Sequence, residues 1–120
     1  MDSLALTKRV IEILDNKKAD QIEAIRVHDV TILGDYFVIA SADNTTHVSA
    51  LADEVEYQLK QEGRLPKSVE GYQTANWIIL DYIDVIVHIF HEPSRNYYNL
   101  EKLWSDGTRL DVKEILGIEE

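Results

Sequence analysis

Cysteine is absent from the 120-residue sequence, which excludes disulfide bonds, thiolate metal sites and a cysteine nucleophile. Glycines are few and widely spaced, so the chain also lacks a glycine-rich loop that could cradle a phosphate. No apolar run approaches the ~20 residues that cross a bilayer, and the first residues do not resemble a signal peptide. We therefore expect a cytoplasmic protein with no membrane contact.

Basic residues are outnumbered, with 12 Lys and Arg against 22 Asp and Glu and a formal charge of -10. The basic residues are dispersed, whereas binding to a phosphate backbone needs clustered Lys and Arg. We therefore predict no direct, sequence-specific binding of nucleic acid. A basic macromolecular surface is the better electrostatic match, although a charge that only keeps the domain soluble explains the total equally well.

Hydrophobic periodicity predicts one domain over residues 1–120. Apolar spacing indicates helices over about 3–17, between Asn44 and Gly63, after Pro93, and over 110–117. Residues 21–28 and 35–41 are typical of strands, the second apolar enough to be buried on both faces. This order predicts an α/β fold with a mixed β-sheet flanked by helices.

Residues 77–90 are rich in Ile and Val with acidic residues in the middle, which favours two strands and a tight turn. A turn at Tyr82 and Ile83 would place Asp81 opposite Asp84 and continue to Trp77 opposite His88. One face of this hairpin is aliphatic and belongs to the core. The other face carries Trp77, Ile79, Asp81, Asp84, Ile86, His88 and Phe90.

This second face has two interpretations. Apolar anchors with acids at one end are what a partner-binding surface needs, because desolvated aromatics give affinity and charges give register. Alternatively, another helix covers the face and Trp77 is an ordinary core residue. The segment after Pro93 raises the same question, since Tyr97, Glu101 and Trp104 would share one side of a single helix ending at Asp106 and Gly107.

Catalytic patterns are weak. His88 and His91 would point to opposite faces of one strand, so they do not form a metal site. No Asp-x-Asp pair is present, and Asp81 and Asp84 approach each other only through the turn, whereas two-metal phosphoryl transfer needs converging carboxylates. We expect a protein that is not an enzyme and that needs no cofactor.

Four runs in order, Gly34–Ser41, Trp77–Tyr82, Asp84–Phe90 and Arg95–Trp104, closely resemble the ribosomal silencing factor (RsfS, Iojap) family. The likeness spans nearly the whole chain. The sequence departs from the family pattern at Ile83, where members often carry glycine, and Ile disfavours the positive φ of a primed turn.

The resemblance implies a nucleotidyltransferase-like topology without the catalytic carboxylates. It further implies binding to the large ribosomal subunit through ribosomal protein L-fourteen, a steric block to joining of the small subunit, and repression of translation under nutrient limitation. A degenerate nucleotidyltransferase that retains nucleotide binding is the alternative, and a homodimer formed by the free protein is a third. The expected partner-binding residues are Trp77, Ile79, Asp81, Asp84, Ile86, His88, Tyr98, Glu101 and Trp104.

Overall fold

Six strands form one mixed sheet with helices on both faces in the computed structural model, which describes residues 2–118. The elements are α1 (Ser3–Asn16), β1 (Asp20–Arg26), β2 (Tyr36–Ala42), α2 (Thr45–Gln61), β3 (Ser68–Glu70), β4 (Trp77–Asp81), β5 (Val85–His91), α3 (Glu92–Tyr98), α4 (Leu100–Leu103), β6 (Thr108–Arg109) and α5 (Val112–Leu116). The predicted α/β class and mixed sheet are confirmed.

The two long helices form where their apolar spacing predicts them. The side chain of Asp2 caps α1 by accepting from the backbone N–H of Ala5, and Asn44 caps α2 by accepting from that of His47. Such caps satisfy N–H groups that the first helical turn leaves without partners. The apolar stripes of both helices, including Leu6 and Leu51, are fully buried.

The sheet has the strand order β3-β4-β5-β2-β1-β6. β2 and β5 lie parallel at its centre, and the other neighbours are antiparallel. All residues of β2 are buried, as expected for a central strand covered on both faces. The outermost strands, β3 and β6, are too short to give a period in the sequence and were not predicted.

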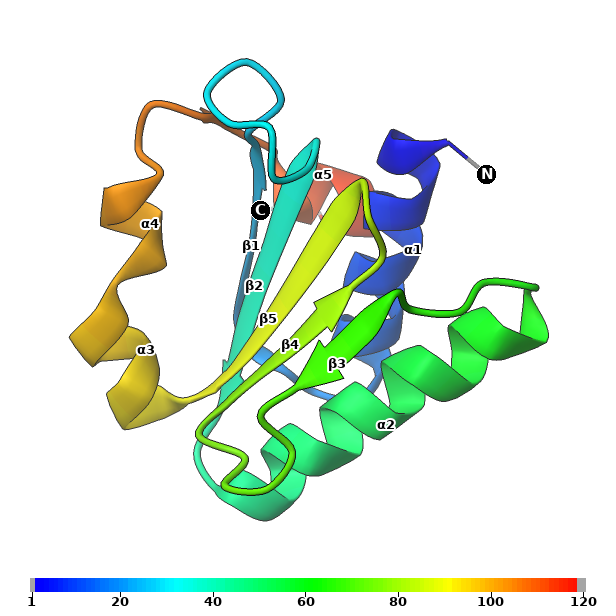
Figure 1. Cartoon of the computed structure of the whole chain (residues 1–120), viewed down its shortest axis with the longest axis vertical. Coiled ribbons are helices and arrows are strands. Elements are labelled where there is room, and N and C mark those ends of the chain that lie inside the picture. The colour runs from blue at the N-terminus through cyan, green and yellow to red at the C-terminus, as the bar shows by residue number, and fades with distance from the viewer. Residues whose placement is uncertain (1, 119–120) are drawn as a thin grey trace.

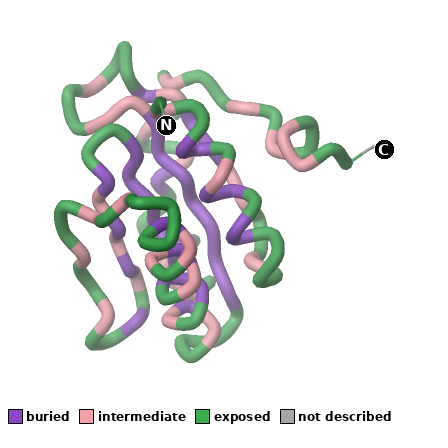
Figure 2. Tube along the Cα trace, turned by 90° about the vertical axis from the view of Figure 1, so that its right-hand side faces the viewer, coloured by how far each residue is buried: buried purple, intermediate pink, exposed green. Residues whose placement is uncertain are grey.

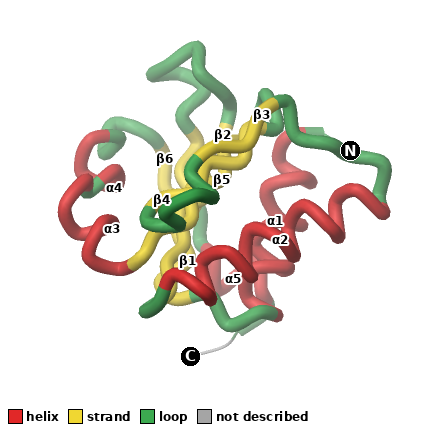
Figure 3. The backbone as a smooth tube through the Cα atoms, turned by 60° about the horizontal axis from the view of Figure 1, so that its bottom comes forward, coloured by secondary structure: helices red, strands yellow, loops and turns green. Residues whose placement is uncertain are grey.

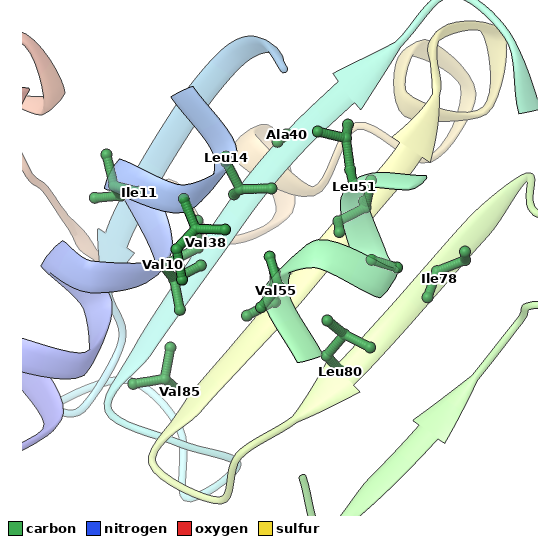
Figure 4. Close-up of a cluster of buried hydrophobic side chains, with 14 of the residues drawn as sticks. Val10, Ile11, Leu14, Val38, Ala40, Leu51, Val55, Ile78, Leu80 and Val85 are labelled. Atoms are coloured by element: carbon green, nitrogen blue, oxygen red, sulfur yellow. The ribbon is translucent and has the colours of Figure 1, made fainter. Parts of the chain in front are cut away.

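Three layers result from this arrangement. Helices α1 and α2 cover one face of the sheet, and the segment with α3 and α4 lies on the other (Figures 1 and 3). The larger core cluster lies under α1 and α2, where Val10, Leu14 and Val55 pack on Val38 and other strand residues (Figure 4). Buried residues are concentrated in the central strands and on one side of each long helix, while the residues of the loops are mostly exposed (Figure 2). No helix within residues 2–118 is long and apolar enough to traverse a bilayer.

The predicted hairpin of residues 77–90 is present, but its predicted register is wrong by two residues. Asp81 pairs with Ile86, and Trp77 pairs with Phe90 rather than with His88. Ile83 takes the positive φ of 74° that a β-branched side chain disfavours. Because side chains alternate along a strand, a shift of two residues leaves every side chain on its predicted face.

The single helix predicted after Pro93 is also wrong. Asn99 takes a left-handed conformation with φ 48° and separates α3 from α4. Asn adopts this conformation more readily than most residues because its short polar side chain forms local hydrogen bonds. Tyr97 consequently points to solvent with 82% of its surface exposed, while Trp104 is partly buried against the sheet.

Candidate partner-binding face

The second face of the sheet carries a smaller apolar cluster. Its buried members come from β1, the residue that follows β1, β2, β5 and α4, and they are joined by Trp77, Ile79 and Trp104, which are only partly buried. The segment with α3 and α4 covers the centre of this face, and the outward side chains of β4 remain partly exposed. The interpretation in which a helix covers the hairpin therefore holds for the centre of the face, and the partner-binding interpretation stays a prediction for its exposed part. We call the part formed by β4, β5, α3 and α4 the partner face.

Trp77 is fixed in place by its neighbours. Its ring stacks on Phe90 with centroids 4.9 Å apart, and the ring of Tyr98 from α3 lies 4.7 Å away. Its indole Nε1 donates a hydrogen bond to Nδ1 of His88 at 3.2 Å. A rigid, half-buried aromatic loses little conformational freedom on binding, which is typical of an interface anchor.

His88 lies beneath the partner face rather than on its surface, with only 6% of its surface exposed. Desolvation by burial lowers the pKa of His88 from its ordinary value of 6.5 to about 4. Because Nδ1 accepts the hydrogen bond from Trp77, the proton of the neutral ring lies on Nε2, which has no partner. His88 is therefore a neutral support for Trp77.

Arg95 holds the α3–α4 segment against the sheet. This guanidinium is 3% exposed, and its Nε donates to Oε2 of Glu101 at 3.4 Å. A second nitrogen donates to Oγ of Ser41 at 3.0 Å. The expected contact residue Glu101 is thus paired within the chain, and its Oε1 is buried without a partner. Sequence reasoning missed this role of Arg95 because Ser41 is far away in the chain and the pairing with Glu101 depends on the break between α3 and α4.

The outer surface of the partner face includes exposed apolar side chains on α3 and α4 and acids at the turn of the hairpin. Tyr98 is 50% exposed and Leu103 is 68% exposed. At the far end of the hairpin, Asp84 is exposed, and Oδ1 of Asp81 accepts a hydrogen bond from the backbone N–H of Ile83 at 2.7 Å. Of the other expected contact residues, Ile79 is partly exposed and Ile86 is buried. The structure thus gathers the predicted residues on one side of the molecule at different depths.

Over residues 2–118, no three or more His, Asp or Glu side chains are grouped so that they could hold a metal ion. The distinguishing property of the partner face is accordingly its aromatic and aliphatic surface.

A family model described as "Ribosomal silencing factor during starvation" matches residues 1–120. The chain belongs to this family. It is 34% identical to ribosomal silencing factor RsfS of Halalkalibacterium halodurans, over 98% of this chain and 100% of that protein. A crystal structure from Chromobacterium violaceum superposes with a TM-score of 0.85 at 31% identity, covering 88% of both chains.

A more distant relative is a mouse protein named "Mitochondrial assembly of ribosomal large subunit protein 1". It is 29% identical over 80% of this chain, and the match covers 43% of the mouse protein. The predicted family is therefore confirmed, and the family name describes a ribosomal silencing factor rather than an enzyme.

Proposed function

We propose that this protein binds the large ribosomal subunit through ribosomal protein L-fourteen and sterically blocks joining of the small subunit. Translation would thereby be repressed under nutrient limitation. Family membership supports a ribosomal role. The observation that carries the proposal is the partner face, where Trp77 is held rigid and partly exposed within an aromatic cluster.

Occupancy alone is sufficient for this mechanism. A 13.8 kDa body on the surface that meets the small subunit fills space which that subunit must enter, so no bond has to be made or broken. The charge of -10 raises the encounter rate with a basic ribosomal protein. Aromatic and aliphatic side chains of the partner face then supply the buried contact area.

Binding of purified large subunits to the immobilised protein tests the proposal. We expect Trp77→Ala to weaken binding by at least about 2 kcal/mol, because a buried aromatic anchor is a typical hot spot. Tyr98→Ala has a matched control in Tyr57→Ala, since these helical tyrosines are 50% and 58% exposed and only Tyr98 belongs to the partner face. The control should bind like the unaltered protein.

Subunit joining tests the consequence of binding. Purified subunits mixed with the unaltered protein should sediment as separate particles, and those mixed with Trp77→Ala should associate more fully. Urea unfolding of each free variant establishes that the variant is folded. Sedimentation of the same free proteins shows whether the partner face pairs with a second copy. Normal joining in the presence of saturating unaltered protein would refute the steric mechanism.

A further inference from the structure

The connection between β1 and β2 is an ordered loop that exposes apolar side chains. Its ends are joined by a 2.8 Å hydrogen bond from the N–H of Val27 to the carbonyl of Asp35. A further bond from Val30 to the carbonyl of Val27 stabilises the turn inside it. Ile32 is fully exposed and Leu33 is 61% exposed. The hydrogen-bonded backbone of the loop thus keeps the side chains of Ile32 and Leu33 exposed to solvent.

The turn between β4 and β5 presents another apolar side chain beside this loop. Ile83 is 61% exposed and has a φ of 74°, and the N–H of Asp84 donates to the carbonyl of Tyr82 at 2.9 Å, the hydrogen bond of a γ-turn. Glycine adopts this conformation with far less strain. An exposed Ile at a position of positive φ contributes little to the stability of the fold. Its side chain is better explained by a contact with another molecule.

The loop and the turn form one surface. The carbonyl of Asp84 accepts from the N–H of Asp35 at 2.7 Å and from that of Tyr36 at 3.1 Å. Ile32 and Ile83 line the same recess. Both segments lie at the upper end of the sheet in Figure 1, where the loop is cyan. We define the apical patch as Val30, Ile32, Leu33 and Ile83.

Acidic groups border the apical patch. The nearby guanidinium of Arg26 is already paired with Asp29 at 2.8 Å, and the ring of His28 is hydrogen-bonded to Asp35 at 2.7 Å. The hydrogen bond from His28 lowers the pKa of Asp35, so this carboxylate stays ionised at neutral pH. Asp84 is exposed on the same recess. The border therefore favours a cationic partner surface.

The apical patch adjoins the partner face. Ile83 lies in the turn that joins β4 to β5, and the predicted contact residue Asp84 lines the same recess as Ile32 and Ile83. We propose that the apical patch is a second contact surface, which inserts apolar side chains into a recess of the same cationic protein surface that the partner face binds. This inference rests on the proposed function.

Binding of purified large subunits to Ile32→Ser/Leu33→Ser measures the contribution of the loop. We expect affinity to fall by about tenfold or more, because two exposed apolar anchors are removed. Leu65→Ser is the matched control, since Leu65 is 68% exposed in the connection between α2 and β3 and does not line the recess that Ile32 and Ile83 share. It should bind like the unaltered protein.

Ile83→Gly separates binding from folding. Removing the strained side chain should leave the midpoint of urea unfolding unchanged or higher, because glycine tolerates the positive φ. Affinity for the large subunit should nevertheless fall severalfold. Asp84→Asn retains the three backbone hydrogen bonds of Asp84 with Tyr82, Asp35 and Tyr36, and it should mainly slow association at low salt.

The outcomes distinguish the two proposals. If the unaltered protein does not bind large subunits, the proposed function fails. If it binds and both apical variants bind equally well, the apical patch is not a contact surface and only this inference is overturned. A dimer of the unaltered protein that dissociates in the Ile32→Ser/Leu33→Ser variant would assign the patch to a second copy and would likewise overturn it.

Discussion

Acidification should destabilise the fold through His88. Burial lowers the pKa of this ring from 6.5 to about 4, so the folded state holds it neutral while the unfolded chain protonates it. Between these two values the unfolded state binds more protons, and stability therefore falls as the pH falls. The contribution is fully present above about pH 6.5 and is lost as the pH falls toward 4.

The magnitude follows from the shift in pKa. One pKa unit corresponds to about 1.4 kcal/mol, so the whole shift of His88 is worth roughly 3 kcal/mol. At about pH 4.5 most of this, about 2 kcal/mol, should already be lost relative to pH 7. Other groups titrate over the same range, so the effect of His88 must be isolated by a variant that cannot be protonated at this position.

The contribution of His88 can be measured by urea unfolding. The unaltered protein and His88→Leu are each unfolded at about pH 7 and at about pH 4.5. The unaltered protein should lose about 2 kcal/mol more than the variant on acidification. Both proteins share every other titrating group, including Asp35, so the difference between their losses reports on His88 alone. Equal losses would show that the ring is not desolvated in the folded state and would refute its role as a neutral support for Trp77.

Three further substitutions test the fold, each by the free energy of unfolding in urea. Leu51→Ala should lower stability by about 2–5 kcal/mol, because Leu51 of α2 is fully buried in the core; a loss below 1 kcal/mol would contradict its place in the core. Asn44→Ala should remove about 1 kcal/mol by deleting the cap of α2, and Asn44→Asp should restore it. Arg95→Ala should destabilise by about 3 kcal/mol, since it strands the partly buried carboxylate of Glu101. The double variant with Glu101→Gln should recover part of that loss, and the absence of recovery would argue against coupling between the two side chains.

For the hairpin of residues 77–90, the sequence predicts the face of each side chain but not the register of the two strands. Alternation along each strand assigned every side chain to its correct face, because that assignment depends only on the period of two. The register depended on the turn, and there the prediction was wrong. The carbonyl of Asp84 is engaged by backbone groups of residues 35 and 36, so a contact between distant segments accompanies the observed turn.

The candidate contact residues show the same division. Their hydrophobic pattern placed Trp77 and Ile79 on the outward face of β4, and the structure leaves both partly exposed. The same pattern could not show that His88 lies beneath Trp77 or that Glu101 pairs with Arg95. These depend on how deeply α3 and α4 pack on the sheet.

The sequence by itself determined the two long helices, the hairpin of residues 77–90 and its two unlike faces, because hydrophobic periodicity is a local property of the chain. Tertiary packing decided the register at Ile83, the break at Asn99, the two short outer strands and the depth of each side chain on the partner face. Each of these depends on contacts between segments far apart in the sequence, whose energies outweigh local preference.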